Sequence, residues 1–518
     1  MQSLKTTHMA NERENLKQFI SKKSDKTFWN VFSILTKLFP EAEIYLVGGM
    51  VRDIARGDES ADYDFVIKDV PTNTIQKKLS TVGKVELVGK TFGVYKWKPE
   101  GEKFHVDIAL PRTDHAFGTG GYKDVDVQFD HTLHIHKDLE RRDFTVNAVA
   151  LRLNDGEIFD PYNGLKDIQE NILRAVGDPH TRFKEDYSRL LRGIRFTCQL
   201  NFSLEPKTSE ALVQYILRLN DTLEDGTWKV PRELVAKEML KAFVANPIKA
   251  LDSYDRYGAL KLLLPEVCDM KGCEQPPNWH SEGDVYVHTK LAISNIFSQE
   301  FTHEFNTSFE ALSKEKPKTA ALVIFAILFH DLGKPPTMQT PEKDGTDRIR
   351  YNNHDSVGAQ LAGDICERLA LSAPEKHGIN CGDLVWIVRN HMVHVMGEIT
   401  EMKNTTIEKY FFNDNVPGDA LIMTMWADAS ATIQEETKGP SFSGYNALLK
   451  KLAEVRMFLD DRDRLPEALL NGNEIMKALK LPSSPELGTI IEALREEQLT
   501  GNISTPEEAL VFIKKYKT

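Results

Sequence analysis

The feature that most constrains the fold is a change of pattern at the turn sequence Asp160-Pro161-Tyr162-Asn163-Gly164. Before this turn, from about residue 41, short apolar strands alternate with helical segments, which is typical of a domain that mixes helices with a sheet. After it, apolar residues recur at helical spacing to the end of the chain. A chain of 518 residues is also too long for one hydrophobic core. We therefore predict an α+β domain followed by all-α domains.

Breaks in this pattern give the expected domain boundaries. Proline and glycine interrupt the helical half near Pro265, at Pro276-Pro277 and at Gly439-Pro440. Five segments are expected: an amino-terminal helical extension (1–40), an α+β head (41–160), a helical neck (161–265), a second helical domain (275–440) and a helical tail (441–518).

Composition indicates an ordinary cytoplasmic protein. The hydrophobic fraction is 41% and the charged fraction 27%. The longest apolar run, Ala320 to Phe329, is too short for a bilayer and predicts a buried core helix, so no membrane partner is expected. The amino terminus is charged where a signal peptide would be apolar. The five cysteines are scattered, which predicts reduced thiols and no disulfide framework.

The net charge of −12 argues mildly against a nucleic-acid partner, because proteins that bind phosphates usually present basic surfaces. The positive charge is concentrated, however. Five basic residues fall within fourteen positions, and Arg141-Arg142 precede them: Arg182, Lys184, Arg189, Arg192 and Arg195. Net charge therefore does not exclude nucleic acid.

A glycine turn provides the first candidate site. Ile44 to Val47 is predicted as a buried strand that runs into Gly48-Gly49 and then a helix. Glycines allow the backbone to approach a phosphate closely, and the amino end of a helix favours an anion. Arg52, one turn into the helix, can add a charged contact.

Three carboxylates follow this turn. Asp62 and Asp64 are two residues apart at the start of an apolar strand, so their side chains are expected on one face. Asp107 lies in the alternating segment Phe104 to Leu110, on the side opposite the apolar residues. Neighbouring carboxylates repel each other unless a cation lies between them. We predict that Asp62, Asp64 and Asp107 bind Mg²⁺ at a phosphoryl-transfer site.

A second site is indicated by His330-Asp331-Leu332-Gly333-Lys334, which follows the apolar run Ala320 to Phe329. With His288 upstream, and Asp428 after another apolar helix, the order resembles that of the HD phosphohydrolase superfamily. Imidazole and carboxylate ligands suit Mn, Ni, Fe or Mg. His354 and His391 are further candidates for substrate contacts or a second metal.

Five blocks in the first half resemble the class II tRNA nucleotidyltransferase and bacterial poly(A) polymerase family. They are Leu46 to Asp53, Asp62-Tyr63-Asp64, Arg141 to Ala148, Asp160 to Asp167 and Glu185 to Phe196. The resemblance implies a polymerase beta-like head in which Asp62, Asp64 and Asp107 are catalytic. It also implies a nucleotide site that includes Gly48, Gly49, Arg52, Arg142, Asp143 and Asn147.

The last block bears on the choice of base. Glu185 to Phe196 is predicted as one helix, on which Asp186 and Arg189 share a face. A carboxylate and a guanidinium can hydrogen-bond the edge of cytosine or adenine. The resemblance implies that Asp186 and Arg189 select CTP and ATP, that Arg192 supports the base or phosphate, and that Pro111 to Asp130 is a flexible loop.

The resemblance therefore implies a CCA-adding enzyme that uses CTP and ATP on the tRNA acceptor arm without a nucleic-acid template. In some bacterial members an HD domain adds phosphatase and 2′,3′-cyclic phosphodiesterase activity. The segments Leu470 to Met476 and Ile503 to Ala509 are similar to the family's tail, which holds the tRNA elbow.

Other functions are compatible with the same residues. A poly(A) polymerase, or an enzyme that adds only A or only CC, would share the catalytic head. A hydrolase acting through the HD site, with a non-catalytic head, would require loss of a carboxylate or of the glycine turn, and both are present. The sequence leaves the oligomeric state open.

Overall fold

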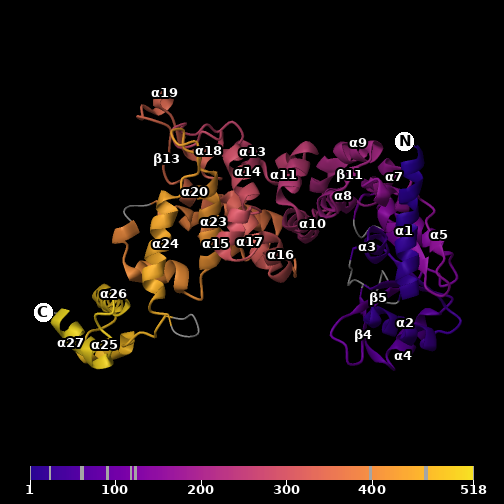
Figure 1. Cartoon of the computed structure of the whole chain (residues 1–518), viewed down its shortest axis with the longest axis horizontal. Helices are drawn as coiled ribbons and strands as arrows, with labels where there is room; N and C mark the ends of the chain where they lie inside the picture. The colour runs from indigo at the N-terminus through magenta and orange to yellow at the C-terminus, as the bar shows by residue number, and fades with distance from the viewer. Residues whose placement is uncertain are drawn as a thin grey trace. The chain divides into compact units, whose positions relative to one another are not determined.

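The computed structural model describes residues 2–22, 25–58, 63–88, 93–116, 119–121, 125–395, 399–459 and 465–516. Asp62 of the predicted metal site lies outside these residues. The chain divides into two compact units, Met1–Leu262 and Leu263–Thr518 (Figure 1). Each unit is described by itself.

The first unit contains a seven-stranded sheet in the order β3-β4-β5-β2-β1-β8-β9. Neighbouring strands are antiparallel except β2 and β5, which are parallel. The strands are β1 (Glu43–Val47), β2 (Asp64–Lys68), β3 (Gly83–Val88), β4 (Val94–Pro99), β5 (Val106–Ala109), β8 (Ala150–Arg152) and β9 (Ile158–Phe159). A separate hairpin is formed by β6 (Arg112–Ala116) and β7 (Val125–Phe129).

Helices cover both faces of this sheet. On one face Phe28 of α2 stacks on Phe65, with ring centroids 5.5 Å apart. On the other face Ile135 and Leu139 of α5 pack with Val66 in a buried cluster. The helices of this part are α1 (Gln2–Lys22), α2 (Lys26–Leu38), α3 (Gly49–Arg56), α4 (Thr72–Leu79), α5 (Ile135–Glu140) and the 3-10 turn η1 (Thr145–Asn147). Adjacent residues of β2 thus face opposite layers, as strand geometry requires.

The remainder of the first unit is almost entirely helical, as predicted. Its helices are α6 (Gly164–Gln169), α7 (Pro179–Glu185), α8 (Ser188–Leu200), α9 (Pro206–Tyr215), the 3-10 helix η2 (Ile216–Asn220), α10 (Arg232–Ala245), α11 (Pro247–Arg256) and α12 (Ala259–Leu263). The short strands β10 (Ile172–Leu173) and β11 (Ser203–Leu204) pair in parallel. Between α8 and α10, Arg195 and Glu238 form a buried ion pair.

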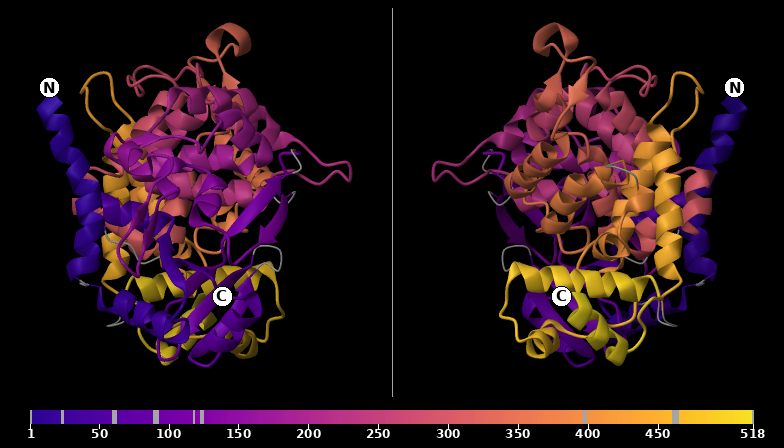
Figure 2. Two further views of the ribbon diagram at one scale, coloured as in Figure 1. Left: turned by 90° about the vertical axis from the view of Figure 1, so that its right-hand side faces the viewer. Right: turned by 90° about the vertical axis from the view of Figure 1, so that its left-hand side faces the viewer.

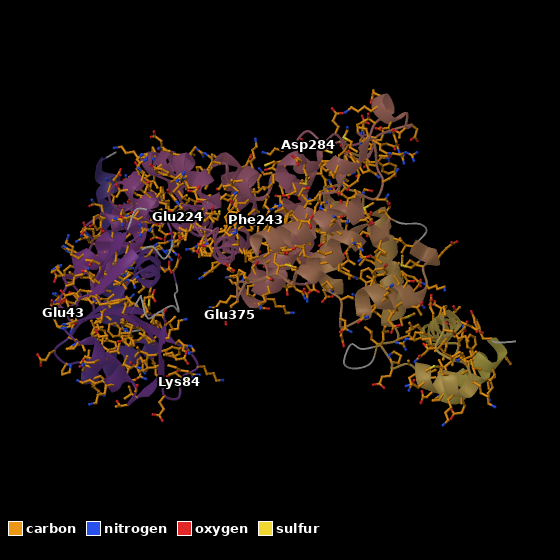
Figure 3. The ribbon with its side chains drawn as sticks, turned by 180° about the vertical axis from the view of Figure 1, so that it is seen from behind. Glu43, Lys84, Glu224, Phe243, Asp284 and Glu375 are labelled. Atoms are coloured by element: carbon orange, nitrogen blue, oxygen red, sulfur yellow. The ribbon has the colours of Figure 1, made fainter. Side chains whose placement is uncertain are left out.

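The second unit is built around α17 (Pro317–Phe329), in which every residue from Ala320 to Phe329 is buried, as predicted. It packs against α14, α16, α21 and α23. Asp284, labelled in Figure 3, caps α14 by accepting a hydrogen bond from the Val287 N–H (2.8 Å).

The other elements of this unit surround that core. They are α13 (Pro265–Asp269), α14 (Val285–Asn295), α15 (Gln299–Phe305), α16 (Phe309–Glu315), α18 (Lys334–Thr337), β12 (Met338–Gln339), α19 (Pro341–Asp344), β13 (Arg350–Tyr351), α20 (His354–Leu369), α21 (Cys381–Asn390), η3 (His391–His394), η4 (Ile399–Glu401), α22 (Asn404–Ile407), the π-helix η5 (Glu408–Phe412), α23 (Gly418–Ala431) and α24 (Ser443–Arg456).

The tail has its own small core. Helices α25 (Gly472–Leu479), α26 (Pro485–Leu499) and α27 (Pro506–Tyr516) form a separate group, in yellow in Figure 2, around buried residues such as Ile475, Ile490 and Ile513. Glu496 of α26 accepts hydrogen bonds from the amides of Asn404 and Thr405, which fastens the tail to α22. None of the described helices is long and apolar enough to cross a membrane.

Glu238→Ala should lower the free energy of unfolding of the first unit by about 3–5 kcal/mol, because it leaves the Arg195 charge buried without its partner. Urea denaturation of the full chain measures this change. Glu233→Ala on the exposed side of the same helix is the control and should change stability by less than about 0.5 kcal/mol. Equal effects of the two substitutions would contradict the prediction.

Candidate active sites

Two predicted metal-binding carboxylates lie side by side in the sheet. The parallel register of β2 and β5 places Asp64 opposite Asp107, and residues opposite each other project from the same face. The Asp107 N–H donates to the Tyr63 carbonyl at 3.0 Å, which fixes the register where the strands begin. Val106 and Ile108 are buried while Asp107 is partly exposed. The predicted alternation in this segment is thereby confirmed.

The glycine turn adjoins these carboxylates. Gly48 has φ of +73°, a conformation that glycine adopts without strain. A Cβ on Gly48 would lie 3.3 Å from both Asp64 Oδ2 and Arg142 Nη1. Gly49 begins α3, and a Cβ there would lie 3.4 Å from Arg52 Nη2. The turn therefore brings a helix amino end, a carboxylate and two guanidinium groups together, which suits a phosphate bound beside a cation.

Asn147 connects the two arginines of this site. Arg52 donates from Nη1 to Asn147 Oδ1 (2.8 Å), and Arg142 donates from Nη1 to the Asn147 backbone carbonyl (3.2 Å). Arg52 also pairs with Asp53 at 2.7 Å. These bonds hold both guanidinium groups in place, so little side-chain entropy remains to be lost on anion binding.

An ion pair between the buried Asp143 and the partly exposed Arg192 joins this cluster to α8. Arg192 donates to Asp143 Oδ2 from Nε (2.8 Å) and lies 2.6 Å from it through Nη2. Asp143 also accepts from the Phe144 N–H (2.8 Å) and from Asn147 Nδ2 (3.4 Å). Burial alone would raise the pKa of Asp143, but the charge and hydrogen bond of Arg192 lower that pKa to about 2. Asp143 is therefore ionised at neutral pH.

The prediction of one continuous helix over residues 185–196 is wrong. Helix α7 ends at Glu185 and α8 begins at Ser188, so Asp186 lies between them in an extended conformation (φ −158°, ψ 106°). Its carboxylate accepts a hydrogen bond from the Ser188 N–H (2.8 Å), the kind of local bond with which aspartate competes with helix formation. Arg189, in the first turn of α8, pairs instead with Glu185 at 2.5 Å. Asp186 and Arg189 thus come from two elements rather than one helix face.

The predicted loop from Pro111 to Asp130 contains the β6–β7 hairpin and reaches this junction. The Tyr187 N–H donates to the Gly120 carbonyl at 3.1 Å. Gly120 has φ of +78°, and a Cβ there would lie 2.0 Å from the Tyr187 ring. Only glycine fits at this contact, which links the hairpin segment to the residue that follows Asp186.

Sequence reasoning missed two charged residues of the head site. Asp138 is fully buried on α5 and pairs with Arg141 (2.8 Å) and Arg142 (3.1 Å), so it orients the arginine that contacts Gly48. Its spacing of three and four residues from the arginines was the available signal. Lys96 lies opposite Asp107 in the β4–β5 register and places a cation beside the carboxylates.

The second unit brings its six predicted ligands together from separate helices. His288 lies in α14, His330 and Asp331 follow α17, His354 begins α20, His391 follows α21, and Asp428 lies in α23. Asp428 was expected after its apolar helix, but it lies inside that helix, three residues before the end. His288 Nε2 is 3.0 Å and His330 Nε2 is 3.8 Å from Asp428 Oδ1.

All four histidines have the orientation expected of metal ligands. Each Nδ1 atom lies within hydrogen-bond distance of a protein oxygen: Glu282 Oε1 for His288 (2.7 Å), and the carbonyls of Ile327 for His330 (2.7 Å), Tyr351 for His354 (2.9 Å) and Val388 for His391 (2.7 Å). Such bonds fix the tautomer and leave Nε2 as the lone-pair donor.

The ligand atoms form two groups that share Asp331. One group is His288, His330 and Asp331, and the other is Asp331, His354 and His391, with all atoms of each group within 4.8 Å of one another. The Nε2 atoms of His330 and His354 are buried and make no hydrogen bond to the described part of the chain. Buried polar atoms left in this way are costly. The donor set therefore fits divalent metal, which nucleotidyltransferase and HD domains typically use.

Burial and neighbouring charges shift the pKa values of the residues in this cluster. Burial, together with the charges of His330 and His354, lowers the pKa of His391 to about 3, so its imidazole is neutral at pH 7. Burial would raise the pKa of Asp331, but His330 and Lys334 hold it well below its ordinary value. Burial would also raise the pKa of Glu282, but hydrogen bonds from His280 and His288 lower it to about 2. His391 is therefore neutral, as a metal ligand must be. Burial would lower the pKa of His288, but hydrogen bonds to Asp428 and Glu282 raise it to about 9, so a metal that binds His288 must displace its proton.

A cavity of about 270 Å³ opens beside these ligands, and His280, Asp331, Lys334 and Asp428 are among the residues that line it. Lys334 Nζ is 2.7 Å from Asp331 Oδ2 and donates to Gln275 Oε1 (2.8 Å). The position of Lys334 suits a substrate phosphate. Sequence reasoning assigned no role to Lys334, although it belongs to the quoted motif, and it missed Glu282, six residues before His288.

Comparison with known proteins agrees with both sites. A model described as the Poly A polymerase head domain matches residues 44–174, and the HD domain model matches residues 301–432. The A-adding tRNA nucleotidyltransferase of Deinococcus radiodurans is 29% identical over 475 residues, covering 91% of this chain and 95% of that protein. The multifunctional CCA protein of Xanthomonas campestris pv. campestris is 32% identical over 335 residues, covering 63% of this chain and 70% of that protein.

Solved structures share the fold. The Thermotoga maritima CCA-adding enzyme, complexed with tRNA, has a TM-score of 0.56 at 18% identity, over 97% of this chain and 98% of that one. The Bacillus stearothermophilus CCA-adding enzyme in complex with CTP has a TM-score of 0.56 at 19% identity, over 95% and 97%.

The fold and the head site define a nucleotidyltransferase of the poly(A) polymerase head type, joined to helical domains that include an HD domain. The chain belongs to the tRNA nucleotidyltransferase family that includes the multifunctional CCA proteins.

Glu282→Gln should weaken metal binding at the HD site about 10- to 100-fold, because it removes the anion that orients His288. Isothermal titration of the full chain with Mn²⁺ measures the affinity. Glu300→Gln, at an exposed position of α15, is the matched control and should leave the affinity unchanged. Equal affinities in both variants would show that Glu282 does not support the site.

Proposed function

We propose that the chain builds or repairs the CCA end of tRNA from CTP and ATP, without a nucleic-acid template, in the cytoplasm. The observation that carries the proposal is the placement of Asp64 beside Asp107, next to the Gly48 turn and Arg142. Support also comes from relatives named as tRNA nucleotidyltransferases and from the fold shared with CCA-adding enzymes. The five-segment division of the chain given above is part of this proposal.

Asp62, Asp64 and Asp107 would hold Mg²⁺, which activates the attacking 3′ hydroxyl and stabilises charge on the leaving pyrophosphate. The amides at Gly48-Gly49 and the amino end of α3 bind the triphosphate. Arg52 and Arg142, held by Asn147, neutralise its charge. These residues align the α-phosphate with the 3′ hydroxyl, because correct orientation supplies much of the rate in phosphoryl transfer.

Asp186 and Arg189 would read the base, and Arg192 would support it. Asp186 follows α7 and Arg189 opens α8, so the two groups converge on an incoming base from two elements. Arg192 is fixed by Asp143, which ties the reading site to the phosphate site. A carboxylate accepts from an exocyclic amine while a guanidinium donates to ring or carbonyl acceptors, a combination that suits both cytosine and adenine.

The HD site would hydrolyse phosphate esters, as a phosphatase or 2′,3′-cyclic phosphodiesterase. His288, His330, Asp331 and Asp428 would hold one divalent ion (Mn, Ni, Fe or Mg), which supplies an activated water. His354 and His391, with the shared Asp331, would hold a second ion. Lys334 lines the cavity and would bind the substrate phosphate.

Addition of A alone is the second candidate. The Deinococcus radiodurans A-adding enzyme matches over 91% of this chain and 95% of its own length, whereas the Xanthomonas campestris multifunctional CCA protein matches over 63% and 70%.

The test is incubation with tRNA that lacks its CCA end, Mg²⁺, and labelled CTP and ATP, separately and together, with products resolved at single nucleotides. Growth by CCA, with termination there, is the expected result. Growth only when the tRNA already ends in CC, by a single A, would establish the A-adding candidate. An A ladder on unrelated RNA would overturn both.

Asp107→Ala should reduce incorporation about a thousandfold, because loss of a metal ligand removes several kcal/mol of transition-state stabilisation. The same variant should retain hydrolysis of 2′,3′-cyclic AMP at the HD site, whereas Asp331→Ala should lose it and still incorporate nucleotides. Glu86→Gln, exposed on β3 of the same sheet, is the control. Wild-type incorporation by Asp107→Ala would contradict the assignment of the head site.

A further inference from the structure

Two cysteines meet between the helices that carry the outer histidines of the HD cluster. Helices α20 and α21 form an antiparallel pair, joined by a loop that contains Glu375, labelled in Figure 3. A Cβ on Gly358 would lie 3.4 Å from Val388, and a Cβ on Gly363 would lie 3.6 Å from Val385. In this antiparallel pair, Gly358 faces Val388 and Gly363 faces Val385. The next facing pair toward the connecting loop is therefore near residues 366 and 381.

Cys366 and Cys381 occupy that position. Backbone bonds fix the loop end: the Leu371 N–H donates to the Cys366 carbonyl (3.1 Å), and the Ile379 N–H donates to the Leu371 carbonyl (3.0 Å). Cys381 Sγ donates to the Ile379 carbonyl (3.8 Å), and the Cys366 thiol lies near enough to shift the pKa of Cys381.

The two thiols have unequal surroundings. Cys381 is partly exposed at the first position of α21, a ten-residue helix whose amino end favours a thiolate. Hydrogen bonds from Cys366 and from the hydroxyl and amide of Ser372 lower the pKa of Cys381. Cys366 is 3% exposed, and its bond to Cys381, together with burial, raises the pKa of Cys366. One thiol can therefore attack an oxidant, and the other is shielded from solvent.

We propose that Cys366 and Cys381 are a reversible redox site that forms a disulfide between α20 and α21. The oxidant is a small disulfide such as oxidised glutathione. The Cys381 thiolate attacks one sulfur of the small disulfide, forms a mixed disulfide and releases one thiolate. Cys366 then loses its proton to solvent and attacks the Cys381 sulfur, which releases the second thiolate. The chain loses two hydrogens, and one small disulfide becomes two thiols.

The cross-link joins the helices that position two of the six predicted HD ligands. Helix α20 begins at His354, and α21 leads directly into His391. The other cysteines have different surroundings: Cys198 is buried in α8, Cys268 lies in α13, and Cys273 contacts Met338 Sδ at 3.9 Å.

The test treats the full chain with oxidised glutathione under native conditions, followed by intact mass and peptide mapping. The expected product has lost two hydrogens and contains the 366–381 link, and dithiothreitol reverses it. Cys366→Ala should stop at a glutathione adduct on Cys381, and Cys381→Ala should leave Cys366 unmodified. Cys268→Ala, in the same unit, should form the link as wild type does. Wild-type protein that carries only adducts, or that links other cysteines, would overturn the proposal without reliance on any variant.

Discussion

The head site depends on the ion pair between the buried Asp143 and the partly exposed Arg192. A carboxylate as buried as Asp143 is costly unless it is paired and hydrogen-bonded. Arg192, Asn147 and the Phe144 amide together meet that need, and in doing so they bind α8 to the segment that carries Arg142. Arg142 is held in turn by the buried Asp138 and reaches the Gly48 turn. The requirement to pair the Asp143 charge therefore also links the residues proposed to bind phosphate to those proposed to read the base.

The HD cluster meets the same constraint differently. Four histidines and two aspartates gather at the ends of helices, and each Nδ1 is paired with a protein oxygen. Burial, together with the charges of His330 and His354, lowers the pKa of His391. A divalent cation would accept the lone pair of the neutral imidazole. A metal that binds only the folded protein would raise its free energy of unfolding. Metal binding would therefore stabilise the packing of α14, α17, α20 and α23.

Features set by neighbouring residues could be predicted from the sequence, whereas features set by residues far apart in the chain could not. Alternation over Phe104 to Leu110 is local, so the face of Asp107 was correct. Four predicted HD ligands stand in a recognisable order (His288, His330, Asp331 and Asp428), whereas His354 and His391 were only further candidates. The strand order that sets β2 beside β5 is long-range, and only the resemblance to a family implied it. The break at Asp186 was missed because helical spacing of apolar residues continues through it, while Asp186 itself is extended and accepts a local hydrogen bond from the Ser188 N–H. Asp138 and Glu282 were missed because each acts by orienting another site residue, Arg142 and His288 respectively. Sequence spacing alone rarely identifies such pairs.

The architecture separates the choice of base from the chemistry. The carboxylates belong to the sheet, where their spacing is fixed by strand register. Asp186 and Arg189 belong to the junction of α7 and α8, where the next residue, Tyr187, holds the Gly120 segment by a backbone hydrogen bond. Changes at the junction or in the β6–β7 hairpin alter the shape presented to a base and leave Asp64 and Asp107 in place. Family members named for A addition and for CCA synthesis could therefore share one catalytic head, because the residues proposed to select the nucleotide lie on a part of the fold that the register of the proposed metal ligands does not constrain.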